Sequence, residues 1–481
     1  MTHRISLSTI SIIPLKSVLI STLMIFSNGC DQGPDYEKPT LELPLAFKYQ
    51  NTDWKKATIQ SSIQPDSWWQ IFDDPTLNKL ERELQQSNYS IKAAEYAYKA
   101  SISLVKQKSA SYYPTLSATS SVSRQQTSSS STQTSASSKP SNIYNMGLSA
   151  SWEIDLFDRI GKSIDVAVAS AEAERANLDA IRLAQQALLA QYYFQLKITD
   201  LKEAALSNQK SDYEELLKIT SNKYDSGIVG QQDILQAQQQ LETLKAQYDD
   251  NTLSRAQLEN AMATLLGKAP SAFNQSKTSR TPQLPHLPFQ IPSALLERRP
   301  DIRQAERLVA EANAQIGLEY TAYFPSLTLS GEGGFQSRQF FDWFTIPSRF
   351  WSLGPTLAYT LFDGGARDAA VEGATFSYEQ TVSNYKNTVL TAFQEVENYL
   401  AELRYLKSEL ELQQQAALHA RQALTIITNQ YKAGINSYSD VLIAQTAASS
   451  SELQSLDTLS RLLVAAVNYV KAIGGSWTTK D

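Results

Sequence analysis

The chain contains the same structural unit twice. Tyr-Tyr-Pro-Thr-Leu at residues 112–116 returns as Tyr-Phe-Pro-Ser-Leu at 323–327, about 210 residues later. Three further pairs keep this order: Leu-Phe-Asp at 156–158 and 361–363, Asn-x-Tyr-x-x-Gly-Ile at 222–228 and 429–435, and Asp-Ile/Val-Leu at 233–235 and 440–442. Matched motifs in one order at a nearly constant offset predict a tandem duplication.

Each unit is expected to hold two very long helices. Residues 162–226 and 374–433 contain neither Gly nor Pro, and helices through these runs would reach ~90–100 Å. Apolar residues then recur at spacings of three and four, which indicates a coiled-coil seam that Asn251 and Arg255 interrupt. The seam consists of Ile234, Ala237, Leu241, Leu244, Tyr248, Leu258, Met262 and Leu265. An intracellular coiled-coil rod or tether would explain these helices, but it would explain neither an export signal nor strands.

The segments before these helices alternate in polarity, as strands do. Between residues 144 and 154 every second residue is Tyr144, Met146, Leu148, Ala150, Trp152 or Ile154. A half-buried soluble sheet gives this alternation, and so does a membrane barrel with a wet lumen. Together with an export signal, the pattern favours the barrel. Four strands cannot close a water-filled pore and lipid does not tolerate open strand edges, so several chains must contribute; three copies would supply twelve strands.

The N-terminus has the pattern of an export signal. Basic residues precede an apolar stretch at 17–26 that is too short to span a bilayer, although a noncleaved signal anchor stays open. The single cysteine, Cys30, follows Ser-Asn-Gly at 27–29, which resembles a lipobox with Ser27 in place of Leu. We therefore expect a lipid on Cys30 and no other cofactor. Asp31, which follows Cys30, resembles an inner-membrane retention signal of lipoproteins. It therefore argues against sorting to the outer membrane by the lipid alone.

Composition excludes several functions. The formal net charge is −6, from 43 basic and 49 acidic residues, which argues against a nucleic-acid partner. One cysteine and three distant histidines indicate no metal site, and we find no catalytic constellation. We therefore expect that the protein is not an enzyme.

These patterns predict a mainly helical chain with a part that contributes to a β-barrel. They also predict how the chain is divided into domains. The expected segments are a signal peptide at 1–29, an extended arm at 30–75, a first repeat at 76–267 with strands at 112–126 and 143–157, a linker at 268–292, a second repeat at 293–475 with strands at 322–337 and 350–362, and a tail at 476–481.

The ordered motifs resemble the outer membrane factor family, to which TolC and OprM belong, and within it the NodT-like lipoprotein branch. The resemblance includes Gly-Pro-Asp-Tyr-Glu-Lys-Pro at 33–39, Trp-Trp-Gln-Ile-Phe at 68–72 and Glu-Arg-Arg-Pro-Asp-Ile-Arg at 297–303. It implies a homotrimer in the outer membrane of a Gram-negative bacterium, with a twelve-stranded barrel that continues into a periplasmic helical barrel. It also implies a periplasmic adaptor and an inner-membrane pump of the RND type. The implied function is the passive exit duct of a tripartite efflux system.

The resemblance implies a gate where the long helices turn, at Gly227 and Gly434. Family tips are closed by polar links and acidic rings, so Asp440 is expected to form a ring carboxylate, with Asp233 and Tyr431 as partners in a polar latch. The family often carries an Arg two residues past the second Gly, where this chain has Asn436. Near the start of the second repeat, Arg298, Arg299 and Asp301 are expected to be structural.

Ordinary helix chemistry offers a competing explanation for these residues. Asp is favoured in the first turn of any helix, and Gly is a common helix terminator. A trimeric structural or adhesive rod without a lumen is the alternative function. It needs no polar strand face, so Glu153, Asp155 and Glu332 count against it.

Overall fold

The structure is a computed structural model that describes residues 33–41, 47–48, 65–126, 140–285, 287 and 298–475. The expected signal peptide at 1–29, Cys30, most of the first strand-connecting loop and the tail at 476–481 lie outside the described residues. The chain divides into two compact units. Unit 1 comprises Met1–Glu37, Ile102–Ala169 and Val309–Gln380, and unit 2 comprises Lys38–Ser101, Ser170–Leu308 and Thr381–Asp481.

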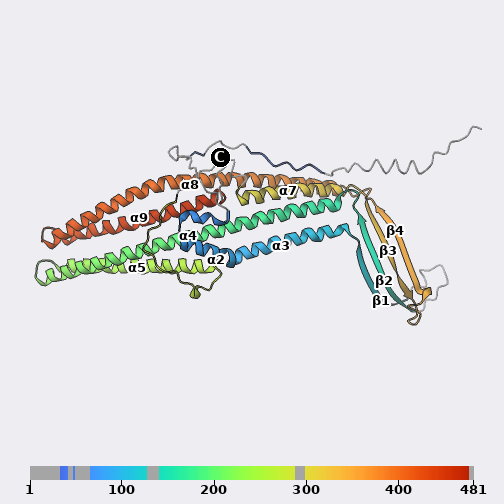
Figure 1. Ribbon diagram of the computed structural model, residues 1–481, viewed down its shortest axis with the longest axis horizontal. Helices are drawn as coiled ribbons and strands as arrows, with labels where there is room; N and C mark the ends of the chain where they lie inside the picture. The colour runs from blue at the N-terminus through green and yellow to red at the C-terminus, as the bar shows by residue number, and fades with distance from the viewer. Residues whose placement is uncertain are drawn as a thin grey trace, which may run out of the picture. The chain divides into compact units, whose positions relative to one another are not determined.

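Unit 1 is built on a four-stranded antiparallel sheet (Figure 1). Its strands follow one another in the order β1-β2-β3-β4, so each pairs with its neighbour in sequence. Their bounds are Thr115–Gln125, Ser141–Ile154, Ser326–Ser337 and Arg349–Ala358. The four strands lie within a few residues of those expected from the alternating patterns.

The register separates an apolar face from a polar face. Trp152 on β2 pairs with Leu329 on β3, which in turn pairs with Pro355 on β4. In the next row Ser151 pairs with Ser330, which pairs with Gly354. Residues paired across antiparallel strands share a face. The apolar residues of the first face are Leu116, Ala118, Val122, Tyr144, Met146, Leu148, Ala150, Trp152, Ile154, Leu327, Leu329, Phe335, Trp351, Leu353, Pro355 and Leu357. Ser120, Ser337 and Arg349 share this face toward the β3–β4 turn.

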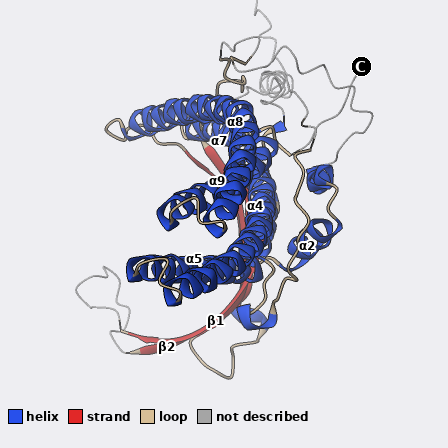
Figure 2. Cartoon of the chain, turned by 90° about the vertical axis from the view of Figure 1, so that its left-hand side faces the viewer, coloured by secondary structure: helices blue, strands red, loops and turns tan. Residues whose placement is uncertain are grey.

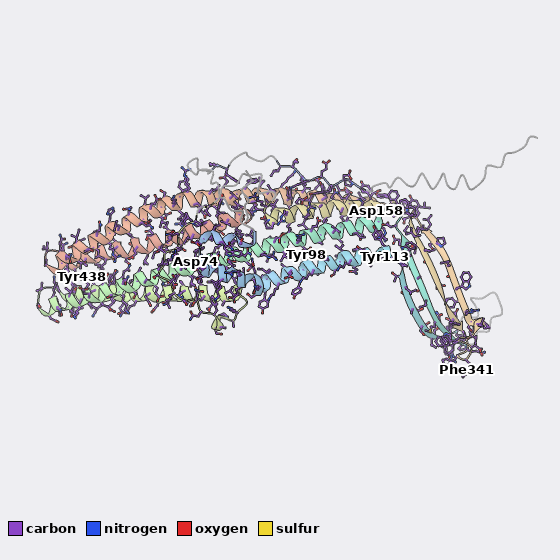
Figure 3. All side chains as sticks on the ribbon, viewed as in Figure 1. Asp74, Tyr98, Tyr113, Asp158, Phe341 and Tyr438 are labelled. Atoms are coloured by element: carbon purple, nitrogen blue, oxygen red, sulfur yellow. The ribbon has the colours of Figure 1, made fainter. Side chains whose placement is uncertain are left out.

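Aromatic side chains gather where β3 turns into β4. The Tyr144 ring centroid lies 5.4 Å from that of Trp343, which stacks on Phe344 at 4.9 Å. Phe341 lies at this end of the strands (Figure 3), and it is 93% exposed. The turn thus carries apolar side chains that the described part of one chain does not cover.

The long helices repeat in length as well as in sequence. Helices α4 (Arg159–Asp225) and α8 (Ala366–Lys432) each have 67 residues, and α5 (Gln231–Leu265) and α9 (Tyr438–Ala472) each have 35. Runs without Gly or Pro permit helices of this length. Within unit 2, α4 and α5 form one helical hairpin and α8 and α9 form the other (Figure 1). The family fold of long helices with a small sheet is thus confirmed.

Shorter helices precede the strands in each repeat. In the first repeat these are two helices, α2 (Pro75–Ser87) and α3 (Tyr89–Ser109). Buried Asn88 separates them, because its Oδ1 accepts from the Ile91 N–H and its Nδ2 donates to the Leu265 carbonyl. In the second repeat α7 spans Pro300–Thr321.

The Arg-Arg-Pro-Asp motif connects three helices of unit 2. The buried Arg299 guanidinium donates to Asp301, to Glu395 of α8 at 2.8 Å and to the Ala472 carbonyl at the end of α9 at 3.0 Å. Such a set of bonds holds the start of α7 in place, which is a structural role. None of the described helices is both long enough and apolar enough to span a bilayer.

Candidate functional site at the helix turns

The two helical hairpins of unit 2 end in turns of the same design. The Gly227 N–H donates to the Tyr224 carbonyl and the Ile228 N–H to that of Lys223, and the second repeat has the same two bonds. This pattern ends a helix with a residue at positive φ, which glycine adopts without strain. Gly227 has φ 72° and Gly434 φ 80°. Figure 2, turned so that this end faces the viewer, shows both turns.

The repeat-equivalent tyrosines differ in environment. Tyr224 is 41% exposed, whereas Tyr431 is 1% exposed. The Tyr431 hydroxyl oxygen lies 3.0 Å from Thr220 Oγ1 of α4. Burial raises the pKa of Tyr431, and the negative charge of Asp233 raises it further. Tyr431 is therefore a neutral buried side chain that links α8 to α4.

Lys223 makes a second link between α4 and α8. Its Nζ donates a hydrogen bond to the Tyr431 carbonyl oxygen and lies 4.0 Å from the centroid of the Tyr431 ring. A cation is favoured both at a helix C-terminus and over an aromatic face. The last turn of α8 is thus held by a positive charge from the other hairpin.

An apolar cluster lies beneath these links. Leu216 and Ala237 of the first hairpin pack with Tyr431, Tyr438 and Val441 of the second. The Tyr431 and Tyr438 ring centroids are 5.9 Å apart, and Tyr438 marks this end of α9 in Figure 3. The two turns are therefore fixed to one another within one chain.

The two acidic candidates have different surroundings. The Asp440 carboxylate accepts from the Ser437 hydroxyl at 2.7 Å and from the Ser437 N–H at 3.0 Å, which lowers its pKa. This is a capping box at the start of α9. Within the described residues, the Asp233 carboxylate has neither a hydrogen bond nor an ion pair. The capping explanation thus applies to Asp440 in the single chain, while Asp233 has no such partner.

The structure brings some expected latch residues together and leaves others apart. Tyr431 bonds to Thr220 rather than to Asp233. The Asn436 side chain donates to Gln430 Oε1 at 2.9 Å, a neutral local bond in place of a charged one. Lys432 pairs with Glu215 at 2.9 Å on the surface, which adds little stability because both groups are exposed. The gate roles of Asp440, Asp233, Tyr431 and Asn436 stay predictions.

Sequence reasoning missed Thr220, Lys223 and Tyr438. All three break the repeat, because Ile427, Gln430 and Gln231 stand at the equivalent positions. Differences between the copies, rather than similarities, were the available signal.

Residues of α4, α8 and α9 line a cleft of about 330 Å³. Asp212 and Arg421 face it from the two sides, and a second cleft of about 280 Å³ toward the turns shares both residues. Gln445 of α9 also lines the cleft, and its buried Oε1 has no hydrogen-bond partner within the described residues. In the described residues, no group of His, Cys, Asp or Glu side chains is arranged to hold a metal ion.

Comparison with known proteins decides the family. The outer membrane efflux protein profile matches residues 80–268 and 291–475. The chain belongs to the outer membrane efflux protein family. It is therefore an outer-membrane efflux protein that serves as an exit duct, which confirms the resemblance inferred from the motifs.

Relatives match it over nearly their whole length. The probable efflux pump outer membrane protein TtgC of Pseudomonas putida is 28% identical over 471 residues, covering 96% of each chain. The probable outer membrane lipoprotein SilC of Salmonella typhimurium is 26% identical over 472 residues, covering 96% of this chain and 99% of SilC. The crystal structure of the Campylobacter jejuni CmeC outer membrane channel superimposes with a TM-score of 0.86 at 25% identity, covering 94% and 96% of the two chains.

Proposed function

We propose that three copies of this chain close one pore, to which each contributes four strands. The observation that carries the proposal is the sheet of unit 1, which has one apolar face and one polar face. Its edge strands, β1 and β4, each have one side without a strand partner among the described residues. An open strand edge leaves backbone N–H and C=O groups without partners, which lipid does not tolerate. Pairing β4 of one copy with β1 of the next removes every edge.

The proposed barrel turns its apolar face to lipid and its polar face to water. Leu116, Leu148 and Leu353 lie on the first face and are all exposed in the single chain. Ser117, Ser149 and Ser352 lie on the second. A water-filled lumen needs this arrangement, whereas a rod without a lumen does not.

The helix turns are the proposed periplasmic gate. The links from Thr220 and Lys223 to Tyr431 favour the arrangement in which both hairpins stay together. Threefold symmetry would turn Asp440 into a ring of three carboxylates, and such a ring attracts cations. Opening would then be a shift between two populations of the tip.

The proposed partners are a periplasmic adaptor and an inner-membrane pump of the RND type. The cleft between α4 and α8 suits a helical adaptor segment, because it offers Asp212, Arg421 and the unpaired Gln445 oxygen to a polar helix. Transport through the duct is passive and involves no catalysis in this proposal.

We further propose that Cys30 carries the lipid that anchors the mature N-terminus in the outer membrane. The lipoprotein name of SilC supports this assignment, as does the position of the single cysteine after an apolar stretch. Mass spectrometry of the mature N-terminus tests it. A diacylglyceryl mass on Cys30 is expected, and an unmodified thiol would refute the anchor.

Face-specific labelling tests the pore. Ser149→Cys and Leu148→Cys are neighbours on opposite faces of β2, and both would be placed in a Cys30→Ser background within lipid nanodiscs. A membrane-impermeant maleimide is expected to label Ser149→Cys rapidly and Leu148→Cys at least about tenfold more slowly, because lipid covers the latter. Native mass spectrometry should give a trimer. Equal labelling of both sites, or a monomer, would contradict the proposal.

A further inference from the structure

The polar face of the sheet carries a single aromatic side chain among the residues of β1–β4. Phe350 on β4 pairs with Gly334 on β3, which pairs with Gly147 on β2. The Phe350 Cζ atom lies 3.3 Å from where a Cβ on Gly147 would stand. The ring therefore passes over β3 at Gly334 and reaches β2.

Glycine at both positions makes this arrangement possible. A Cβ on Gly334 would lie 2.2 Å from the Met146 carbonyl oxygen, so the two backbones approach too closely for any side chain there. An aromatic ring laid across strand glycines covers backbone that no side chain protects. Phe350 is half-buried, so part of its ring is accessible to a molecule on the polar side of the sheet.

A carboxylate that forms no ion pair among the described residues lies on the same face as this ring. Glu332 occupies the next row of the same face, two residues along β3 from Gly334, or about 7 Å away. Its Oε1 accepts a hydrogen bond from Ser352 Oγ at 3.2 Å. No cationic side chain pairs with it in the described part of the chain. Glu153, on the same face, differs because Arg159 binds it at 2.7 Å.

We infer that Phe350 and Glu332 form a contact site for flat organic cations in the lumen of the duct. The inference rests on the proposed pore, with the polar face turned inward. A carboxylate attracts a cation, and an aromatic face attracts it as well and stacks on its apolar surface. The surrounding Ser, Thr and Gly residues offer neither property. The site therefore favours ligands that are both positively charged and flat. It lies toward the strand ends that are joined by the β3–β4 turn.

Ethidium, a planar aromatic monocation, is the probe. Its fluorescence anisotropy is measured against the full-length protein in nanodiscs of zwitterionic lipid. Phe350→Leu keeps the volume but removes the aromatic face, and it is expected to weaken binding about tenfold. Glu332→Gln is expected to weaken ethidium binding about threefold and to remove most of the salt dependence of that binding. Phe350→Tyr keeps the aromatic face and should bind as the unaltered protein does.

Neighbouring residues supply matched controls. Trp351→Leu removes an aromatic ring from the opposite face, and Glu153→Gln removes the carboxylate that Arg159 neutralises; both should leave ethidium binding unchanged. Neutral N-phenylnaphthylamine should depend on Phe350 and not on Glu332. Binding that is insensitive to Phe350→Leu, or equally weakened by Trp351→Leu, would overturn the site while face-specific labelling still upheld the pore. Equal labelling of both faces would overturn the pore and this site with it.

Discussion

The Tyr431 hydroxyl oxygen lies 3.0 Å from Thr220 Oγ1, across the junction between the two helical hairpins. Both side chains are buried, so water does not replace the bond when it is lost. Tyr431→Phe keeps the ring and removes the bond, which should cost the closed tip about 1 kcal/mol, or roughly a fivefold shift toward opening. The open probability of single channels measures the shift. Tyr224→Phe, at the exposed equivalent position, is the control and should change nothing.

Lys223 holds the end of α8 by charge. Lys223→Met should increase the open probability by about three- to tenfold, because the closed tip loses a cation over the Tyr431 ring and at a helix C-terminus. Lys223→Arg should restore most of the closure. Lys218→Met removes an exposed lysine five residues earlier and should have no effect. An unchanged open probability in Lys223→Met would show that the cation does not hold the tip.

A buried ion pair fixes the segment between the repeats. Asp200 accepts from Arg255 at 2.7 Å and from the Thr278 N–H at 3.0 Å, and Arg255 also donates to the Gln275 carbonyl. Arg255→Met leaves Asp200 buried without its partner and should cost about 3–5 kcal/mol. Thermal unfolding of the purified protein tests this. Asp200→Asn combined with Arg255→Met should recover part of the loss, and a double variant worse than the single one would contradict the account.

Glu81 makes stability depend on pH. Burial raises the pKa of its carboxyl well above its ordinary value of 4.5, and neither oxygen has a hydrogen-bond partner within the described residues. The protonated carboxyl is tolerated in the folded state, so the free energy of unfolding is highest below the pKa of Glu81 in the unfolded chain. It falls as the pH rises through the raised pKa of the folded state, because a buried charge then forms. Glu81→Gln should therefore stabilise the protein by about 1–3 kcal/mol near pH 8 and much less near pH 4.

The melting temperature at both pH values measures the effect of Glu81→Gln. The exposed Glu242→Gln is its control and should show no such difference. A gain in Glu81→Gln that is equal at both pH values would exclude titration of Glu81 as its cause.

Local sequence patterns predicted the elements of this fold well. Runs without Gly or Pro locate the long helices, because those two residues are the strongest interruptions of a helix. Period-two alternation separated the faces of the sheet before any register was known. The break at Asn88 was not predictable, because it depends on a bond to Leu265 far along the chain.

The site was less predictable than the fold. Gly227 and Gly434 carry their own signal, since each turn needs positive φ. Lys223 and Thr220 differ from their repeat equivalents, but that difference does not identify Tyr431 as their partner, because these contacts form only when the two hairpins pack in one particular register. The coiled-coil seam did include Arg255 as an interruption, but its partner Asp200 lies on another helix.

We propose that the chain forms a conducting duct whose tip is closed by the helix turns. Single-channel recording in planar bilayers tests it most directly, with the unaltered protein beside an Asp233→Ala/Asp440→Ala variant. We expect small, cation-preferring currents that grow in the variant, since carboxylate rings favour cations and narrow the tip. A large conductance that the variant leaves unchanged would contradict the gate. No current from either protein, with trimers shown to be inserted, would contradict the duct itself.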